Sequence, residues 1–293
     1  KEFIAASMTM DISNQNKLSE FYEELKRLKV EIVRPDINNC FADFISRDDK
    51  FYYALGGIKA VGFEAISNVV KERVANGKFS SIKDFIKRVN PKDINKLQLE
   101  GLVKAGAFDE LNNNRQSLFN SIPHMISKSK NDFENKIANQ IDLFGENEDK
   151  ESNMIEKIDD WDFEERLSKE FEAVGFFISN HPLNQFKEIF DDYKIIDYLD
   201  FNHNEDYKEA NVAATLLKVQ ERKTAKGNSY AVLKLTDLNS VFELFIFSDM
   251  LELNREILKE GNSLIITLNK SFSNDENQTK RINARKIASL KDL

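Results

Sequence analysis

Hydrophobic residues in the first two thirds of the chain recur mostly at the spacing of amphipathic helices. Residues 17–28 place four large apolar side chains on one helical stripe, namely Leu18, Phe21, Leu25 and Leu28. The helical pattern returns over residues 58–90, with breaks at Gly62 and at the Asn76-Gly77 pair. These patterns predict an N-terminal part built mostly from short helices.

Short polar signals mark where the predicted elements begin and end. Residues 30–33 read as a short strand. Ser81 and Asp84 have the spacing of a capping box at the start of a helix. Asp162 is placed to cap a later helix, which we expect to end at His181-Pro182 because proline cannot continue it.

The hydrophobic period changes after residue 210 to the alternation that is typical of strands. A helical stretch over residues 249–259 lies between the third and fourth of five predicted strands, an order that suggests an OB-fold. Another small β-barrel is the alternative. The five strands are Val212–Val219, Tyr230–Leu235, Val241–Phe247, Leu264–Leu268 and Ile282–Ile287.

The predicted fold class is therefore a multidomain α+β protein, with a mostly helical N-terminal part followed by a C-terminal five-stranded OB-fold β-barrel. Residues 128–160 separate these parts and are polar, acidic and rich in Asn and Lys. This composition cannot supply a core, so we expect the segment to be largely exposed and mobile.

The composition is typical of a globular protein in a reducing compartment. The 293 residues allow two or more domains, and 41% hydrophobic with 31% charged residues is ordinary for a soluble protein. Cys40 is the only cysteine, which excludes a structural disulfide and favours the cytoplasm. His124, His181 and His203 lie far apart and match no metal-ligand spacing. The chain begins at Lys1 without an initiator Met, so we expect it to come from a longer polypeptide.

The net charge of −8 hides a strong segregation of charge along the chain. Residues 131–172 contain 15 acidic and 5 basic side chains, whereas residues 78–104 contain 7 basic and 3 acidic ones. The overall charge therefore says little about any single surface. Mild local basicity is also explained by a solvated helix face.

Two glycine-containing turns each join two predicted amphipathic helices. They comprise Lys59, Ala60, Val61 and Gly62 in the first, and Lys104, Ala105, Gly106 and Ala107 in the second. A turn that exposes backbone amides at a helix N-terminus suits a phosphate oxygen, and such contacts hold a duplex without reading its sequence. Lys59 and Lys104 would add positive charge. The alternative is two ordinary helix connections with glycine at the C-cap.

The first loop of the predicted barrel is basic, with Arg222, Lys223 and Lys226. In OB-folds the loops and the second and third strands bind single strands, so these cations would follow phosphates. Alternation in the third strand sends Phe242, Leu244 and Ile246 to the core and Glu243, Phe245 and Phe247 to the other face. Tyr230 and Phe245 are the candidates for stacking on bases, although packing is the commoner role of an aromatic residue.

A short apolar island interrupts the acidic segment. It consists of Gln140, Ile141, Asp142, Leu143 and Phe144. Leu143 and Phe144 can enter an apolar pocket on a partner while the Gln140 amide forms hydrogen bonds, as in peptide docking. The alternative is a turn that folds back onto the chain's own core. No catalytic constellation, phosphate-binding loop or nucleophile motif is recognisable elsewhere.

Several segments together are similar to one family. The chain resembles the bacterial DNA polymerase III alpha subunit over essentially its whole length. The matching segments are Ala5–Asp11, Val33–Asn38, Tyr53–Gly62, Leu102–Asp109 and Val174–Leu183.

The resemblance implies an order of parts. Residues 1–48 look like the end of the fingers domain, and 49–118 like a tandem helix-hairpin-helix region that binds duplex DNA. Residues 119–160 would be a flexible segment with a clamp-binding motif, 161–205 a helical connector, and 206–293 the OB domain. The partners implied are double-stranded DNA, single-stranded DNA, the β sliding clamp and other holoenzyme subunits.

The resemblance also implies what this chain lacks. The family's catalytic aspartates and the Mg²⁺ that they bind belong to an upstream palm domain, so this chain is expected to need no cofactor and to be inactive alone. Ala60 departs from the glycine that the family usually has there. The family's final domain, which contacts the clamp loader, has no counterpart after Leu293. A DNA repair or ligase-like protein and a non-enzymatic DNA-binding adaptor are the alternatives; the four-cysteine zinc site of NAD-dependent ligases is absent.

Overall fold

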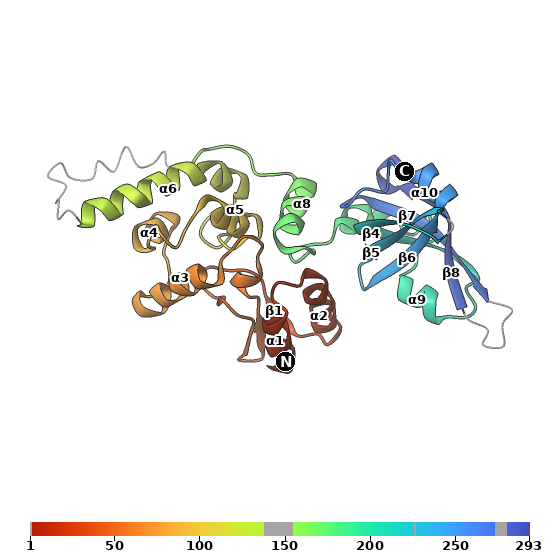
Figure 1. The fold of residues 1–293 in the computed structure, drawn as a ribbon, viewed down its shortest axis with the longest axis horizontal. Coiled ribbons are helices and arrows are strands. Elements are labelled where there is room, and N and C mark those ends of the chain that lie inside the picture. Colours follow the sequence, from red (N-terminus) through yellow and green to blue (C-terminus); the bar gives the residue numbers. More distant parts are fainter. Residues whose placement is uncertain (1, 138–154, 226, 273–279) are drawn as a thin grey trace. The chain divides into compact units, whose positions relative to one another are not determined.

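The computed structural model describes residues 2–137, 155–225, 227–272 and 280–293. The chain divides into two compact units, residues 1–179 (unit 1) and residues 180–293 (unit 2), and each is described by itself (Figure 1). The five-part division expected from the sequence is finer than this and stays a prediction.

Unit 1 begins with two helices and a small sheet. Helix α1 (Glu2–Met10) is followed by α2 (Gln15–Arg27), whose first turn is capped by the Asn14 side chain. Strands β1 (Glu31–Val33), β2 (Ile45–Arg47) and β3 (Lys50–Tyr52) form a sheet in the order β1-β3-β2. The strand β1 pairs in parallel with β3, and β2 pairs antiparallel with it.

In the described part of unit 1, five further helices and one 3₁₀ turn follow. Their bounds are η1 (Leu55–Gly57), α3 (Phe63–Asn76), α4 (Ile82–Arg88), α5 (Lys96–Lys104), α6 (Arg115–Ile137) and α8 (Phe163–Val174). Side chains cap several of them; the sequence predicts the caps at Ser81 and Asp162 but not the one at Asn95. Ser81 accepts from the Asp84 amide, Asp162 accepts from the Glu165 amide, and Asn95 forms a full capping box at α5.

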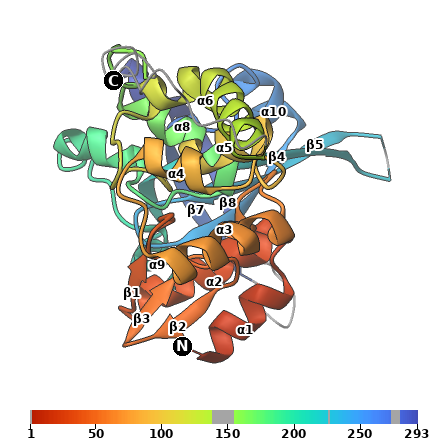
Figure 2. The same ribbon diagram turned by 90° about the vertical axis from the view of Figure 1, so that its left-hand side faces the viewer.

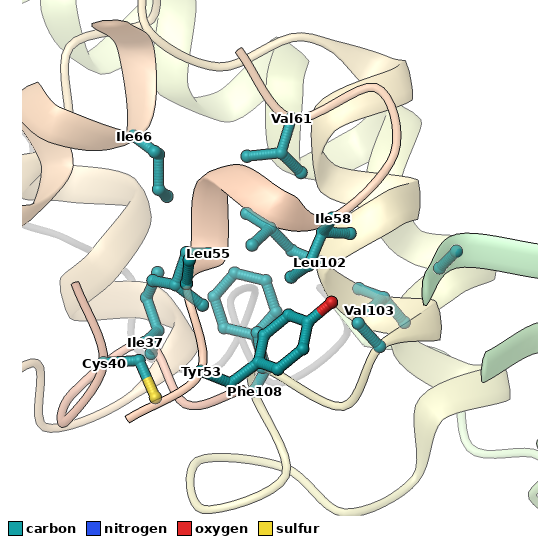
Figure 3. Packing of buried hydrophobic residues seen from close by; sticks show 14 of the residues in the cluster. Ile37, Cys40, Tyr53, Leu55, Ile58, Val61, Ile66, Leu102, Val103 and Phe108 are labelled. Atoms are coloured by element: carbon teal, nitrogen blue, oxygen red, sulfur yellow. The ribbon is translucent and has the colours of Figure 1, made fainter. Parts of the chain in front are cut away.

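One hydrophobic core runs through unit 1 and joins its first residues to the later helices. Ile58 and Val61, beside η1, face Leu102 of α5 in this core (Figure 3). Gly101 makes that approach possible, because a Cβ there would lie 2.7 Å from the Lys59 carbonyl oxygen. The segment before α3 is therefore packed closely on α5.

Unit 2 is built on a five-stranded antiparallel sheet in the order β6-β5-β4-β7-β8. Its strands are β4 (Glu209–Lys223), β5 (Ser229–Thr236), β6 (Val241–Phe247), β7 (Ser263–Phe272) and β8 (Lys280–Ser289), and α10 (Ser248–Asn254) lies between β6 and β7. Five antiparallel strands with a helix after the third confirm the predicted OB-like domain. The sheet is not closed, since no backbone pairing joins the edge strands β6 and β8.

Shorter elements cover this sheet. The segments η2 (Pro182–Ile189), α9 (Tyr198–His203) and η3 (Leu290–Asp292) belong to unit 2. Phe201 of α9 is buried in the core, and the Tyr198 ring stacks on Phe242 with centroids 3.8 Å apart. Strand β4 pairs with β7 over residues 209–215 and with β5 from Thr215 onward, and its register with β5 shifts between Leu216 and Lys218.

Several sequence expectations need correction. Helix α6 continues to Ile137, so the first part of the stretch expected to be mobile is helical. The helix after Asp162 ends at Gly175 in the left-handed conformation, before His181-Pro182, which instead begins η2. Leu28 is exposed beyond the end of α2. Arg222 and Lys223 belong to β4, because the β4–β5 hairpin is longer than expected (Figure 2).

Candidate nucleic-acid interface

The first glycine turn is fixed to the rest of unit 1 by backbone hydrogen bonds, and its tip is exposed to solvent. The Lys59 amide donates to the Ala173 carbonyl at the end of α8 (2.9 Å), and the Val61 amide donates to Ile58 (3.1 Å). Val61 is buried, whereas Lys59 and Ala60 are exposed. The turn therefore has a fixed base and a solvent-facing tip.

Unpaired amides gather at that tip. Gly62 is the N-cap of α3 and is exposed, as are Phe63 and Glu64 in the first helical turn. The amides in the first turn of a helix have no carbonyl group one turn earlier to which they can donate. In the described chain, the amides of Ala60 and of these three residues donate no backbone hydrogen bond. Lys59 has no acidic partner among the described residues. Amides, helix dipole and one cation can thus meet a phosphate oxygen.

Ala60 occupies a conformation that favours glycine. Its φ is +64°, in the left-handed region, where a Cβ costs about 1–2 kcal/mol. Alanine at position 60 therefore keeps the conformation that favours glycine and stores strain in the backbone of the turn. Because Ala60 is exposed, its methyl group contacts solvent at the tip, where it would stand beside an approaching phosphate.

The second glycine turn has a different structure. Gly106, with φ of +80°, follows the end of α5. The Gly106 amide donates to Val103 (3.0 Å) and the Ala107 amide to Leu102 (2.9 Å), which is the Schellman arrangement at a helix C-terminus. Ala105, Gly106 and Ala107 are all buried. These amides are used within the chain, so the geometry does not favour phosphate contact here.

Lys104 is also occupied. Its ammonium group is 2.8 Å from a Glu172 carboxylate oxygen and lies over the Phe119 ring at 5.4 Å. The side chain is only 13% exposed. The charge that the sequence assigned to DNA is thus neutralised by α8.

A buried guanidinium explains why position 106 is glycine. Arg115 forms two bonds to Asp109 (2.9 and 2.7 Å), one to the Lys104 carbonyl (3.0 Å) and an ion pair with Glu170 (3.4 Å). A Cβ on Gly106 would lie 2.1 Å from Arg115 Nη2. Burial lowers the pKa of Arg115, but Asp109 and Glu170 outweigh it, and the pKa lies above its ordinary value.

The candidate single-strand residues lie at one end of unit 2. Cross-strand register places three residues from each of β4, β5 and β6 on one face of the sheet. We call this the β4–β6 face; its residues are Lys218, Gln220, Arg222, Tyr230, Val232, Lys234, Glu243, Phe245 and Phe247.

The β4–β6 face brings together most of the predicted residues. Arg222 is directly opposite Tyr230, which is opposite Phe247. Phe245 and Phe247 are 54% and 60% exposed, and Tyr230 is half-buried. Phe247 was not among the predicted stacking residues, although the alternation of the strand puts it beside Phe245.

Of the other two predicted basic residues, the structure shows one to lie off this face and does not describe the other. Lys223 pairs with Ser229 and points to the opposite side by alternation. Lys226 lies outside the described residues, as does the predicted clamp motif Gln140–Phe144. Of the helices in the described ranges, none is both long and apolar enough to cross a membrane.

Comparison with known proteins agrees with this geometry. A model of the "Helix-hairpin-helix motif" family matches residues 29–118, which include both glycine turns. The chain is 32% identical over 281 residues to DNA polymerase III subunit alpha of Borreliella burgdorferi, covering 94% of this chain and 24% of the relative.

Other relatives carry the same description. DNA polymerase III subunit alpha of Caulobacter vibrioides is 30% identical over 90% of this chain, and that of Rickettsia bellii is 33% identical over 95%. The chain spans 23% and 27% of these two relatives. The match therefore covers nearly all of this chain but about a quarter of each curated relative.

Proposed function

The chain belongs to the DNA polymerase III alpha-subunit family, as a segment about a quarter as long as its relatives, and we propose that it holds DNA during template-directed synthesis. The observation that carries this proposal is the first glycine turn, where unpaired amides, the N-terminus of α3 and Lys59 share one exposed tip. Such a tip binds the duplex backbone through phosphates and reads no sequence.

Duplex binding is tested by fluorescence anisotropy with short duplexes of unrelated sequence. We expect equal affinities and a fall of roughly tenfold between about 50 and 200 mM salt, as for two neutralised phosphates. Gly62→Val should weaken binding to every duplex alike, since it adds bulk at the tip. Strong preference for one duplex, or affinity that salt does not change, would contradict the proposal.

Unit 2 is proposed to bind single-stranded DNA on the β4–β6 face. Exposed Phe245 and Phe247 supply stacking surfaces, and Arg222 lies in the same row for the phosphates. Replacing both phenylalanines with alanine should weaken oligonucleotide binding about tenfold or more, since stacking contributes ~1–3 kcal/mol per base. The matched control is Leu253→Ala, which removes an 82% exposed side chain on α10. An equal loss in both variants would reject the face.

Residues 140–144 are proposed to dock into the peptide groove of the β sliding clamp, on the strength of their sequence pattern alone. Burying Leu143 and Phe144 contributes roughly 3–6 kcal/mol before ordering costs, so we expect micromolar affinity. Docking would tether the polymerase near the primer end and make synthesis processive. Calorimetry with the clamp should show lost heat for Leu143→Ala/Phe144→Ala; an unchanged isotherm would remove the assignment.

The whole subunit's nucleotidyl transfer, its other holoenzyme partners and a cytoplasmic location remain part of the same proposal. A template–primer extension assay separates a polymerase segment from a repair enzyme or an adaptor. We expect extension only when this chain is joined to a palm domain. Strand joining or cleavage by this chain alone would favour the repair reading.

A further inference from the structure

Strands β7 and β8 have a charge composition that the rest of the chain lacks. Together they carry five cationic side chains and no carboxylate, in a chain with a net charge of −8. The five are Lys270, Lys280, Arg281, Arg285 and Lys286. A concentration of one sign on two neighbouring strands attracts a polyanion if the side chains are available.

Two of these cations serve the fold. The Lys270 ammonium group donates to the Asn204 carbonyl (2.5 Å) and lies 4.7 Å from the centre of the Phe201 ring. Lys280 donates to the Asn202 carbonyl. Both lysines thus satisfy carbonyl groups at the C-terminal end of α9. They are not available to a ligand.

The other three cations differ in their pairing. Arg285 is the extra residue of a β-bulge, and its guanidinium is 2.5 Å from Glu209 on β4, two strands away. Arg281 and Lys286 are exposed, and neither has an acidic partner among the described residues. Within the described ranges, these two cations of β8 therefore have no counter-charge.

Register places these two cations on one polar face. Lys286 is opposite Thr267, and Thr267 is opposite Asn211 on β4; Arg281 is opposite Ser271. Between these rows, Asn283 is opposite Asn269, which is opposite Glu209 on β4, the partner of Arg285. We call this the β7–β8 face.

The amides on the β7–β8 face are not all satisfied. Asn211 accepts from Thr267 (2.8 Å) and donates to the Tyr193 carbonyl (2.9 Å), and Asn283 donates to Ser271 (3.2 Å). The Asn269 side-chain oxygen, by contrast, is buried and accepts no hydrogen bond from the part of the chain that the structure describes.

We propose that the β7–β8 face binds the sugar–phosphate backbone of a single nucleic-acid strand, an inference that rests on the proposed single-strand function of unit 2. Arg281 and Lys286 bind phosphates, and the asparagine amides bind sugar or phosphate oxygens. The face carries no exposed large hydrophobic side chain among its described residues. An acidic peptide would find no apolar anchor here, whereas a nucleic-acid backbone needs none.

This face is distinct from the β4–β6 face. Leu183 covers the outer surface between them, in a small cluster with Ala213 and Ile265. The irregularity near Leu216 and Lys218 further separates the two halves of β4. The β4–β6 face offers aromatic rings, and the β7–β8 face offers only charge and hydrogen bonds, so their contributions to binding can be measured separately.

The test is the salt dependence of binding of a labelled oligo-dT to the full chain. Arg281→Gln/Lys286→Gln should reduce the slope of log affinity against log salt by about 1.4 and weaken binding roughly tenfold or more near 0.1 M salt. The matched control is Lys187→Gln/Lys259→Gln, which removes two exposed lysines elsewhere in unit 2. It should change the slope little.

The outcomes separate nucleic-acid binding by the β7–β8 face from binding by the β4–β6 face and from binding of an acidic peptide. If both double variants change the slope equally, the β7–β8 face has no special role. If Phe245→Ala/Phe247→Ala leaves affinity unchanged while Arg281→Gln/Lys286→Gln lowers the slope, the β4–β6 proposal fails and the β7–β8 inference stands. Equal competition by an oligo-glutamate peptide of the same charge would overturn the inference in favour of an acidic protein segment.

Discussion

The two glycine turns of unit 1 have similar sequences and opposite environments. In Lys59–Gly62 the glycine precedes a helix, and its neighbouring amides face solvent. In Lys104–Ala107 the glycine follows a helix, and its amides close the Schellman arrangement. A helix presents free amides at its start and free carbonyls at its end, so only the first turn has donors left for a phosphate.

The lysines of the two turns also differ in exposure and pairing. Lys59 is exposed and unpaired among the described residues, whereas Lys104 pairs with Glu172. The second turn instead holds α5, α6 and α8 together through Arg115. We therefore propose that the first turn contacts DNA and that the second stabilises unit 1.

The largest expected effect is that of Gly106→Ala. The new Cβ would displace Arg115 from Asp109 and Glu170, and the positive φ adds strain. Breaking a buried ion pair costs ~3–5 kcal/mol, so we expect unit 1 to lose at least ~3 kcal/mol of stability. Cys40 reports this loss, because it is the only cysteine and its loop bonds to Ala107 through the Ile37 amide (2.8 Å).

Alkylation of Cys40 provides the measurement. Burial raises the pKa of this thiol to about 12, so it reacts only when unit 1 opens. A loss of ~3 kcal/mol should speed alkylation by roughly 100-fold. Gly77→Ala is the matched control: Gly77 also has a positive φ, but a Cβ there meets nothing within 4 Å. Equal rates for the two variants would mean that Arg115 does not depend on Gly106.

Ala60→Gly should have the opposite sign and a smaller size. Removing the Cβ relieves ~1–2 kcal/mol of left-handed strain, and the extra freedom of the unfolded chain returns part of it. We expect a net gain of ~0.5–1 kcal/mol, visible as slower Cys40 alkylation. A destabilised variant would show that the Ala60 methyl group makes a favourable contact.

Glu64→Gln should give the smallest effect, on binding rather than stability. Glu64 is exposed in the first turn of α3, where its charge repels a phosphate that approaches the same amides. Neutralising it should raise duplex affinity roughly twofold near 0.1 M salt. Glu110→Gln, at an exposed site beside the second turn, is the control and should have no effect. Equal gains in both variants would indicate only a change in net charge.

Local patterns predicted much of the fold. Alternation in β6 correctly put Phe242, Leu244 and Ile246 inside and Phe245 outside, because a strand has only two faces. Capping by Ser81 and Asp162 was also predictable, since a cap depends on residues three apart. The family resemblance supplied the order of the two parts.

Long-range contacts could not be predicted in the same way. The burial of Gly106 depends on Arg115 and on Glu170, which lies far along the chain in α8. The residues around Lys104 in the sequence do not predict its ion pair with Glu172. The β7–β8 face likewise depends on a bulge at Arg285 that shifts the register of β8 by one residue. Local sequence fixes elements and their caps, but not which turn another helix covers.

The central claim is that the first turn contacts duplex DNA and the second does not. The direct test measures duplex affinity against salt for Lys59→Gln and Lys104→Gln. We expect Lys59→Gln to lower the slope of log affinity against log salt by about 0.9, the loss of one phosphate contact, and Lys104→Gln to leave it unchanged. A slope that falls for Lys104→Gln and not for Lys59→Gln would contradict the account.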